Sequence, residues 1–147
     1  MPTIATPTWT TVARLGLATV AAAAVNTGIA LGATALDDGG MGVGLAPVAY
    51  LPATVIGLLA GAFGWTLIAR RSPRALRVVV PAVLVLTWIP DLLLLTAGAT
   101  AANVVGLMLM HLVVTTAVVT ALGTSHAATG DAWAEDAPGP ARTPSAG

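Results

Sequence analysis

Three polar side chains stand inside long apolar stretches of this sequence, and they are the residues best suited to chemistry. Asp91 follows Pro90 in an apolar run, His111 lies among leucines and methionines, and Asn26 is set among alanines. An ionisable side chain inside a membrane is costly and usually faces other helices or a water-filled path. The chain has no cysteine, which excludes thiol chemistry and cysteine-ligated metals.

Asp91 admits two interpretations. An aspartate at the centre of a membrane span costs about 2.5–3.5 kcal/mol of insertion free energy, so we expect Asp91 to have a role that compensates for this cost. In the functional interpretation it is a proton- or cation-binding carboxylate beside a helix that Pro90 kinks. In the structural interpretation its carboxylate caps a short outer half-helix by accepting the amide of Leu93 or Leu94.

His111 is expected near the middle of the fourth apolar run, deeper in the membrane than Asp91. If the last two helices form a hairpin about Gly98, Asp91 lies level with Val105 and His111 lies about 9 Å deeper. A direct hydrogen bond between the two side chains would then require a kink, a tilt or a bridging water. One imidazole with one carboxylate is an incomplete ligand set, so neither a metal site nor a catalytic site is expected.

Asn26 shares a helical face with small residues, namely Thr19, Ala22, Ala30 and Ala33. That placement predicts a hydrogen bond from Asn26 to a neighbouring helix. Such bonds within membranes contribute about 2 kcal/mol or less. Asp91, His111 and Asn26 therefore form the candidate polar site inside the membrane.

The elements that must position these residues are four apolar helices. Hydrophobic residues make up 56% of the 147 and charged residues only 8%, whereas a soluble domain has about 25% charged residues. A run of about 20 apolar residues crosses a bilayer core of about 30 Å. We therefore predict an all-α, up-down bundle of four transmembrane helices over residues 15–36, 47–69, 78–95 and 103–122. Residues 1–14 form a short leader, and residues 123–147 form a disordered tail rich in Ala, Gly, Pro, Thr and Ser.

Arginines set the predicted orientation. Four of the six basic residues stand between the second and third apolar runs: Arg70, Arg71, Arg74 and Arg77. By the positive-inside rule this loop stays on the cytoplasmic side, where it meets anionic lipid headgroups. Both termini are then cytoplasmic, and the protein is a multi-pass protein of the plasma membrane. Residues 37–46, which are acidic and glycine-rich, form a solvated outer loop.

Small residues at four-residue spacing indicate where helices approach closely. Gly28 and Gly32 have this spacing in the first helix, and Gly57 and Gly61 repeat it in the second. In lipid, close backbone packing replaces much of the hydrophobic effect as the attraction between helices. These glycines pack either within one four-helix bundle or at the interface of a homo-oligomer.

Signatures of soluble enzymes are absent from the sequence, which has no phosphate-binding loop, no G-x-S-x-G, no H-E-x-x-H and no dinucleotide fingerprint. No cofactor is expected, and there is no basic surface for nucleic acid. We predict a non-enzymatic integral membrane protein, structural or accessory to a membrane protein partner. The alternative is a small proton- or cation-coupled transporter, or a channel-like oligomer, that uses Asp91.

Two short stretches carry a resemblance to a known family. After the arginine-rich loop come Ile-Pro-Asp-Leu-Leu at residues 89–93 and Leu-Met-Leu-Met-His-Leu-Val at residues 107–113. This pattern resembles a family of small four-helix integral membrane proteins of actinobacteria, to which no activity is assigned. The resemblance implies four helices over about residues 12–122 and assigns no catalytic residue.

The predicted orientation is testable because the chain has no cysteine of its own. Single cysteines at Gly40 and Ser72 should behave differently in intact cells treated with a membrane-impermeant thiol reagent. We expect Gly40→Cys to be labelled from outside and Ser72→Cys to be labelled only after the cells are opened. Labelling of Ser72→Cys but not of Gly40→Cys in intact cells would reverse the topology.

Overall fold

Four long helices form the fold, and the predicted all-α architecture is confirmed. A computed structural model describes residues 9–135, with side chains through residue 123. Within that part of the chain, four helices are long and apolar enough to span a membrane. The elements are, in chain order, α1 (Trp9–Leu36), α2 (Pro47–Arg71), the 3-10 helix η1 (Pro73–Ala75), α3 (Leu76–Leu93), the 3-10 helix η2 (Leu94–Ala97) and α4 (Ala101–Glu135).

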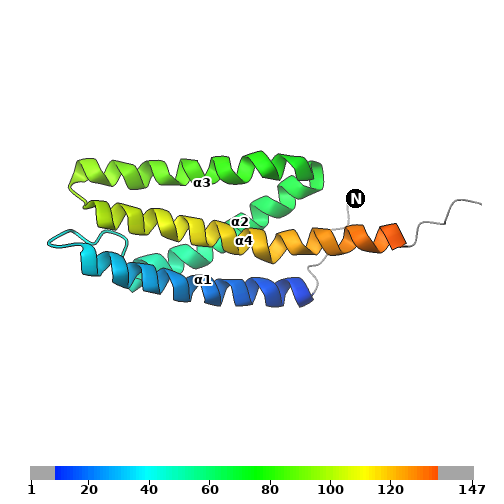
Figure 1. The fold of residues 1–147 in the computed structure, drawn as a ribbon, viewed down its shortest axis with the longest axis horizontal. Coiled ribbons are helices and arrows are strands. Elements are labelled where there is room, and N and C mark those ends of the chain that lie inside the picture. The colour runs from blue at the N-terminus through cyan, green and yellow to red at the C-terminus, as the bar shows by residue number, and fades with distance from the viewer. Residues whose placement is uncertain (1–8, 136–147) are drawn as a thin grey trace, which may run out of the picture.

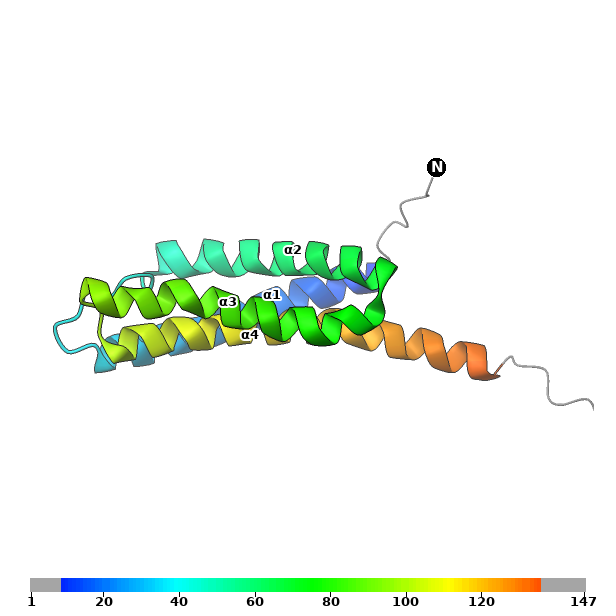
Figure 2. The ribbon, with the colours of Figure 1, turned by 90° about the horizontal axis from the view of Figure 1, so that it is seen from above.

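The helices run alternately up and down around α4 (Figures 1 and 2). α4 packs against each of the other three helices, and its most extensive contact is with α1. α2 and α3 contact each other little. α4 is therefore the central helix of the bundle.

Local sequence signals explain where the helices begin and end. Pro47 occupies the first turn of α2, where its missing amide proton costs little. Ser72 separates α2 from η1 in an extended conformation, because the residue before a proline avoids the helical region. Gly98 ends η2 with a φ of 93°, a left-handed conformation that glycine adopts without steric cost.

Two predicted helix boundaries differ from the structure by more than two residues. α1 begins at Trp9 rather than at residue 15, because neither proline nor glycine interrupts residues 9–14. α4 continues to Glu135 rather than ending at residue 122, so the predicted disordered tail is helical over its first part. Alanines favour the helix, and extending a formed helix needs no new nucleation. Residues 136–147 of that tail lie outside the described residues.

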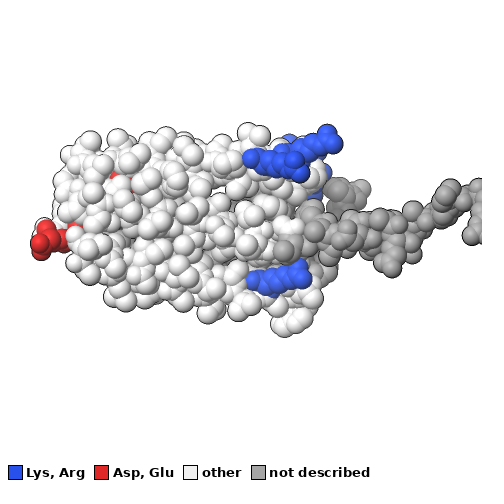
Figure 3. Space-filling view, in the orientation of Figure 1, with Lys and Arg blue, Asp and Glu red and all other residues white. Residues whose placement is uncertain are grey.

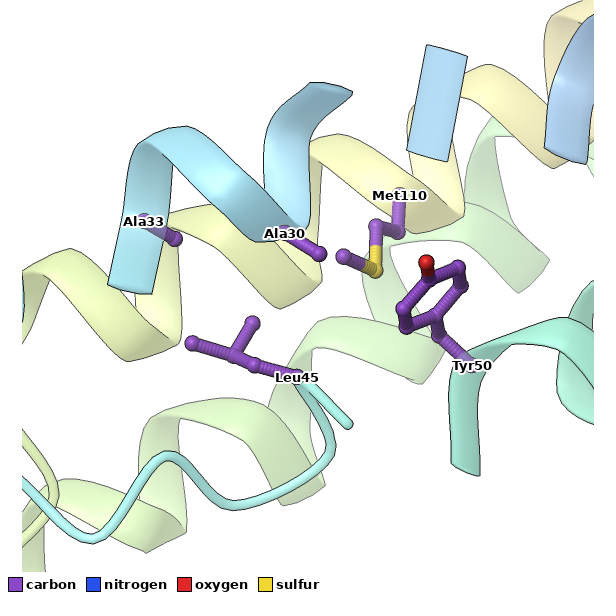
Figure 4. Packing of buried hydrophobic residues seen from close by; sticks show 5 residues of the cluster. All are labelled: Ala30, Ala33, Leu45, Tyr50 and Met110. Atoms are coloured by element: carbon purple, nitrogen blue, oxygen red, sulfur yellow. The ribbon is translucent and has the colours of Figure 1, made fainter. Parts of the chain in front are cut away.

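Buried apolar residues form two layers along the bundle. Near the loop between α1 and α2, the layer shown in Figure 4 consists of Ala30, Ala33, Leu45, Tyr50 and Met110. Farther along α4, a second layer consists of Ala22, Leu58, Val118 and Leu122. Alanines supply the α1 side of both layers, which lets α4 come close. Large apolar side chains instead cover the outer faces, where they contact lipid.

Glycines of α2 and α4 pack inside the bundle. A methyl group on Gly106 would lie 2.7 Å from the Cβ atom of Ala33 in α1. A methyl group on Gly61 would lie 2.9 Å from a side-chain carbon of Val118 in α4, and one on Gly57 would also meet α4, at 3.2 Å. These glycines therefore act as sites of close approach between helices, as the spacing of Gly57 and Gly61 predicts.

Gly28 and Gly32 behave differently from the glycines of α2. A methyl group built on either one meets no other atom within 4 Å in the described part of the chain. Both residues are exposed on the outer side of α1. Packing within the bundle therefore accounts for only one of the two predicted glycine pairs.

The loop between α1 and α2 is tied to the start of α4. Asp37 accepts a hydrogen bond from the Thr100 hydroxyl and another, at 3.1 Å, from the amide of Gly42. Asn103, which is fully buried, donates its side-chain amide to the Val43 carbonyl at 3.0 Å. The loop predicted to be solvated is thus bonded to α4 at Asp37 and Val43, because buried polar groups of α4 need partners and the loop supplies them.

This loop geometry also decides where a topology label belongs. A Cβ atom at Gly40 would overlap the carboxylate of Asp37, so a cysteine there would disturb the contact with α4. Met41 is 57% exposed and is the better position for an outer label. Met41→Cys pairs with Ser72→Cys, whose residue is exposed at the other end of the bundle.

Among the residues whose side chains the structure describes, charge is separated along the long axis of the bundle. Arginine side chains gather at one end and aspartates at the opposite end (Figure 3). The end with the arginines contains the exposed side chains of the connection between α2 and α3: Arg70, Arg71, Arg74 and Arg77. The intervening length is nearly free of charge, as a segment inside a bilayer must be.

Candidate functional site

Asp91 on α3 meets His111 on α4 directly. The Asp91 Oδ2 atom lies 3.0 Å from the His111 Nδ1 atom. α3 exposes most of its apolar side chains and buries only Leu76 and Asp91. A carboxylate costs far more in lipid than against a polar partner, so α3 turns its one acidic residue toward α4 and its leucines toward lipid.

The expected depth difference of about 9 Å between these residues is wrong, for two reasons. The turn between α3 and α4 includes η2 and the residues after Gly98, so its centre lies after Gly98 rather than at it. A 3-10 helix also rises about 2.0 Å per residue rather than about 1.5 Å, which moves Asp91 farther from the turn. Helical side chains also lean toward the N-terminus of their own helix. Because α3 and α4 are antiparallel, Asp91 leans away from the turn and His111 leans toward it, so the two side chains converge.

Asp91 does not cap a half-helix. α3 continues through Pro90 to Leu93 without a break, so no new helix begins at Asp91. The amide of Leu94 bonds to the backbone carbonyls of Asp91 and Leu92, not to the carboxylate. One backbone bond lost at a proline does not end a helix whose neighbours and length stabilise it. The carboxylate is therefore free to face α4.

One ring nitrogen of His111 faces two acceptors. The Nδ1 atom lies 3.0 Å from the Leu107 carbonyl oxygen and 3.0 Å from Asp91 Oδ2. Since both neighbours are acceptors, we assign the ring proton to Nδ1 from these partners. The geometry favours the bond to Leu107, because Asp91 Oδ2 has no hydrogen-bond partner among the described residues. The contact with Asp91 is thus electrostatic, and Nε2 remains available to another group.

Asn26 forms the predicted bond to a neighbouring helix. Its Nδ2 atom donates to the Thr54 hydroxyl on α2 at 2.8 Å, and Thr54 donates to the Tyr50 carbonyl at 2.8 Å. The Tyr50 hydroxyl donates to Thr27 on α1 at 3.1 Å. Neither Tyr50 nor Thr54 was predicted from the sequence to take part in this connection. Their four-residue spacing, which places both on one face of α2, was the signal that could have found them.

A cavity of about 430 Å³ adjoins both polar groups. Asn26 of α1 and His111 of α4 line it, together with Tyr50 and Thr54 of α2 and Thr87 of α3. Asp91 is not part of the lining and reaches the cavity only through His111. The volume lies in the range of about 300–1,000 Å³ that is typical of small-molecule sites. The structure therefore brings the three predicted residues near one space without joining them into one cluster.

The described residues contain no group of three or more His, Cys, Asp or Glu side chains that could hold a metal ion.

No family model, curated protein or solved structure matches this chain. No family is identified, and the resemblance therefore rests on the two short stretches alone. The four long apolar helices indicate a small four-span membrane protein.

We expect Asp91 and His111 to be energetically coupled. A double-mutant cycle with Asp91→Asn and His111→Gln, measured by unfolding in mixed micelles, should give a coupling energy of about 0.5–2 kcal/mol. Each single change leaves the other side chain with an altered partner, whereas the double change removes the contact. A control cycle combines Asp91→Asn with Thr66→Val, at an exposed position of α2. We expect no coupling energy in this cycle. Additive effects for Asp91 and His111 would mean that their contact contributes nothing to stability.

Proposed function

We propose that this protein is a non-enzymatic component of the membrane, structural or accessory to a partner. The use of its intramembrane polar groups supports this proposal. Asn26 joins α1 to α2, Tyr50 repeats that connection through Thr27, and His111 of α4 meets Asp91 of α3. Polar groups used in this way stabilise a bundle from within. Because these polar groups are used inside the bundle, a partner would bind to the outer faces of the helices.

The partner surface in this proposal is the face of α1 that carries Gly28 and Gly32. Both glycines are exposed without a neighbour in the described bundle, and the exposed Ala24 extends the face by one turn. Glycines four residues apart let a second transmembrane helix approach closely. We take that helix to be α1 of a second copy of this chain, because most oligomers are symmetric and pair the same face on both subunits.

Replacing both glycines with isoleucine should weaken self-association while leaving the chain folded. A Cβ atom at Gly28 or Gly32 would meet no other atom within 4 Å in the described bundle, and the added side chains would hold a second α1 helix away. Energy transfer between two differently labelled preparations, reconstituted together in liposomes, reports the association. We expect the dissociation constant to rise by about tenfold or more, equivalent to a loss of about 1.4 kcal/mol.

Gly106→Ala is the matched control for this experiment. Its methyl group would lie 2.7 Å from the Cβ atom of Ala33, so the chain should lose about 1–3 kcal/mol of unfolding free energy. Copies that remain folded should still associate. If the variant with isoleucine at positions 28 and 32 associates as well as the unchanged protein, the α1 face is not the partner surface.

The proposal also includes the orientation of the protein in the membrane. We place both termini and the arginine-rich connection in the cytoplasm, with the protein in the plasma membrane. The gathering of arginines at one end of the bundle supports this placement (Figure 3), because short loops rich in arginine are retained on the cytoplasmic side. There the exposed guanidinium groups meet anionic lipid headgroups.

A second candidate function, movement of a proton or a cation, is favoured by a different observation. Asp91, His111 and the cavity lie in series, with His111 in contact with the other two. Protonation of Asp91 would weaken its attraction to His111 and bias how α3 packs on α4. This function requires Asp91 to change its charge, whereas a structural role does not.

Proteoliposomes that contain a pH-sensitive dye separate the two candidates. The structural role predicts no proton flux above that of empty liposomes, both before and after Asp91→Asn. Transport predicts a flux that Asp91→Asn abolishes, because the asparagine amide keeps a similar shape without titrating. Thr66→Val, which alters an exposed hydroxyl of α2, should leave any flux unchanged. A flux that persists in Asp91→Asn would exclude Asp91 as the ion-binding group.

A further inference from the structure

The connection between α2 and α3 carries positive charge that the described part of the chain does not neutralise. All four of its arginine side chains are exposed, namely Arg70, Arg71, Arg74 and Arg77. Apart from Asp91, which faces His111, the described aspartates lie at the opposite end of the bundle (Figure 3). No described carboxylate therefore pairs with these arginines, and their guanidinium groups are available to an anion from outside the bundle.

Backbone hydrogen bonds hold this connection in one conformation. The Ser72 amide donates to the Ile68 carbonyl of α2 at 2.9 Å, and the Ser72 carbonyl accepts an amide of η1 at 3.0 Å. The ring of Pro73 fixes the φ angle of the next residue. Arg71 and Arg74 are thus held three residues apart, a length of chain that spans at most about 11 Å. A site fixed in advance loses less conformational entropy when a ligand binds.

Exposed apolar side chains continue from each of these two arginines along its own helix. Residues four apart form a ridge along one side of a helix. The ridge of α2 that ends at Arg71 consists of Leu59, Phe63 and Leu67, all exposed. The ridge of α3 that follows Arg74 consists of Val78, Ala82 and Leu86, also exposed.

The length of the two ridges agrees with the thickness of one leaflet. Each ridge covers twelve residues from its arginine to its far end, a rise of about 18 Å. Half of a bilayer core is about 15 Å thick. The apolar residues of both ridges lie within candidate membrane spans, and the arginines lie at or near the ends of those spans. Each ridge therefore places a guanidinium group at headgroup level with an apolar surface beneath it.

This arrangement is complementary to a phospholipid, with its phosphate at the arginine and its acyl chains along the ridge. A guanidinium group can bind a phosphate through two parallel hydrogen bonds. Because Ser72 and Pro73 join the two ridges closely, a single lipid with two linked phosphates can reach Arg71 and Arg74 together. A lipid with one phosphate can reach only one of them in the same way.

We propose that the connection between α2 and α3 binds cardiolipin, in which one glycerol joins two phosphatidyl groups. One phosphate lies at Arg71 and the other at Arg74, and Arg70 and Arg77 add positive charge beside them. The inference rests on the proposed placement of this connection at anionic headgroups. It narrows that general attraction to one class of lipid.

Native mass spectrometry of the full-length protein in a neutral detergent tests this proposal. The protein is titrated with cardiolipin, or with phosphatidylglycerol of the same acyl chains, which carries one phosphatidyl group instead of two. We expect the dissociation constant of cardiolipin to be lower by about tenfold or more, because its second phosphate binds within the same complex. A ratio of about two or less, which is what two phosphates acting separately would give, would overturn the proposal.

Inorganic phosphate as a competitor distinguishes a lipid from a free anion. At a concentration equal to that of the lipid phosphate it should not displace cardiolipin, because it has no acyl chains to lie along the ridges. Displacement at that concentration would overturn the assignment to a lipid. The measured masses also give the number of protein copies in each complex, so a failure to bind cardiolipin is read separately from a failure to self-associate.

Three variants locate the site. Arg71→Gln and Arg74→Gln each remove one phosphate contact at an exposed position, and each should bring the dissociation constant of cardiolipin close to that of phosphatidylglycerol. Arg14→Gln removes the same charge from α1, outside the connection, and should leave the preference for cardiolipin unchanged. An equal loss in all three variants would mean that only the overall charge attracts the lipid, and it would overturn the proposal.

Discussion

The close approach of α1 and α4 is the constraint on which the rest of this bundle depends. Gly106 has no side chain, and even one methyl group there would lie 2.7 Å from the Cβ atom of Ala33. In lipid, burying apolar surface releases no water, so helices gain attraction mainly by bringing their backbones into contact. With α1 and α4 set at this distance, α4 presents two further faces. α2 packs against one through its own glycines, Gly57 and Gly61.

α3 attaches to the remaining face of α4 by a different kind of contact. Its apolar side chains mostly face outward, while Asp91 turns toward His111 and the Trp88 indole donates to the Met108 carbonyl at 3.3 Å. α2 is thus held to α4 by close packing and α3 by polar groups, and the two contact each other little. The cavity lies where these two attachments leave room, with Asn26 and His111 in its wall.

These contacts separate the surfaces that the protein offers to other molecules. The outer face of α1, with Gly28 and Gly32, points away from the described bundle and suits a helix. The cavity lies on the other side of α1, toward Asn26 and Thr54. Because different residues form the two surfaces, loss of one does not entail loss of the other.

Length and hydropathy were sufficient to predict four helices, because a span needs about 20 apolar residues whatever it packs against. Helical periodicity likewise placed Asn26 on the buried face of α1 with Ala22, Ala30 and Ala33, and it predicted a hydrogen bond to a neighbouring helix, though not to which one. Spacing could not decide which glycine pair packs inside, since that depends on where neighbouring helices lie.

Only the tertiary structure brought Asp91 to His111. Their contact depends on the turn formed by η2 and Gly98 and on side chains of antiparallel helices leaning toward each other, neither of which is a property of residue spacing. The same holds for the cavity, whose wall draws on all four helices. Sequence therefore determined the four helices and the buried face of α1, and the packing of the helices decided which residues of different helices meet.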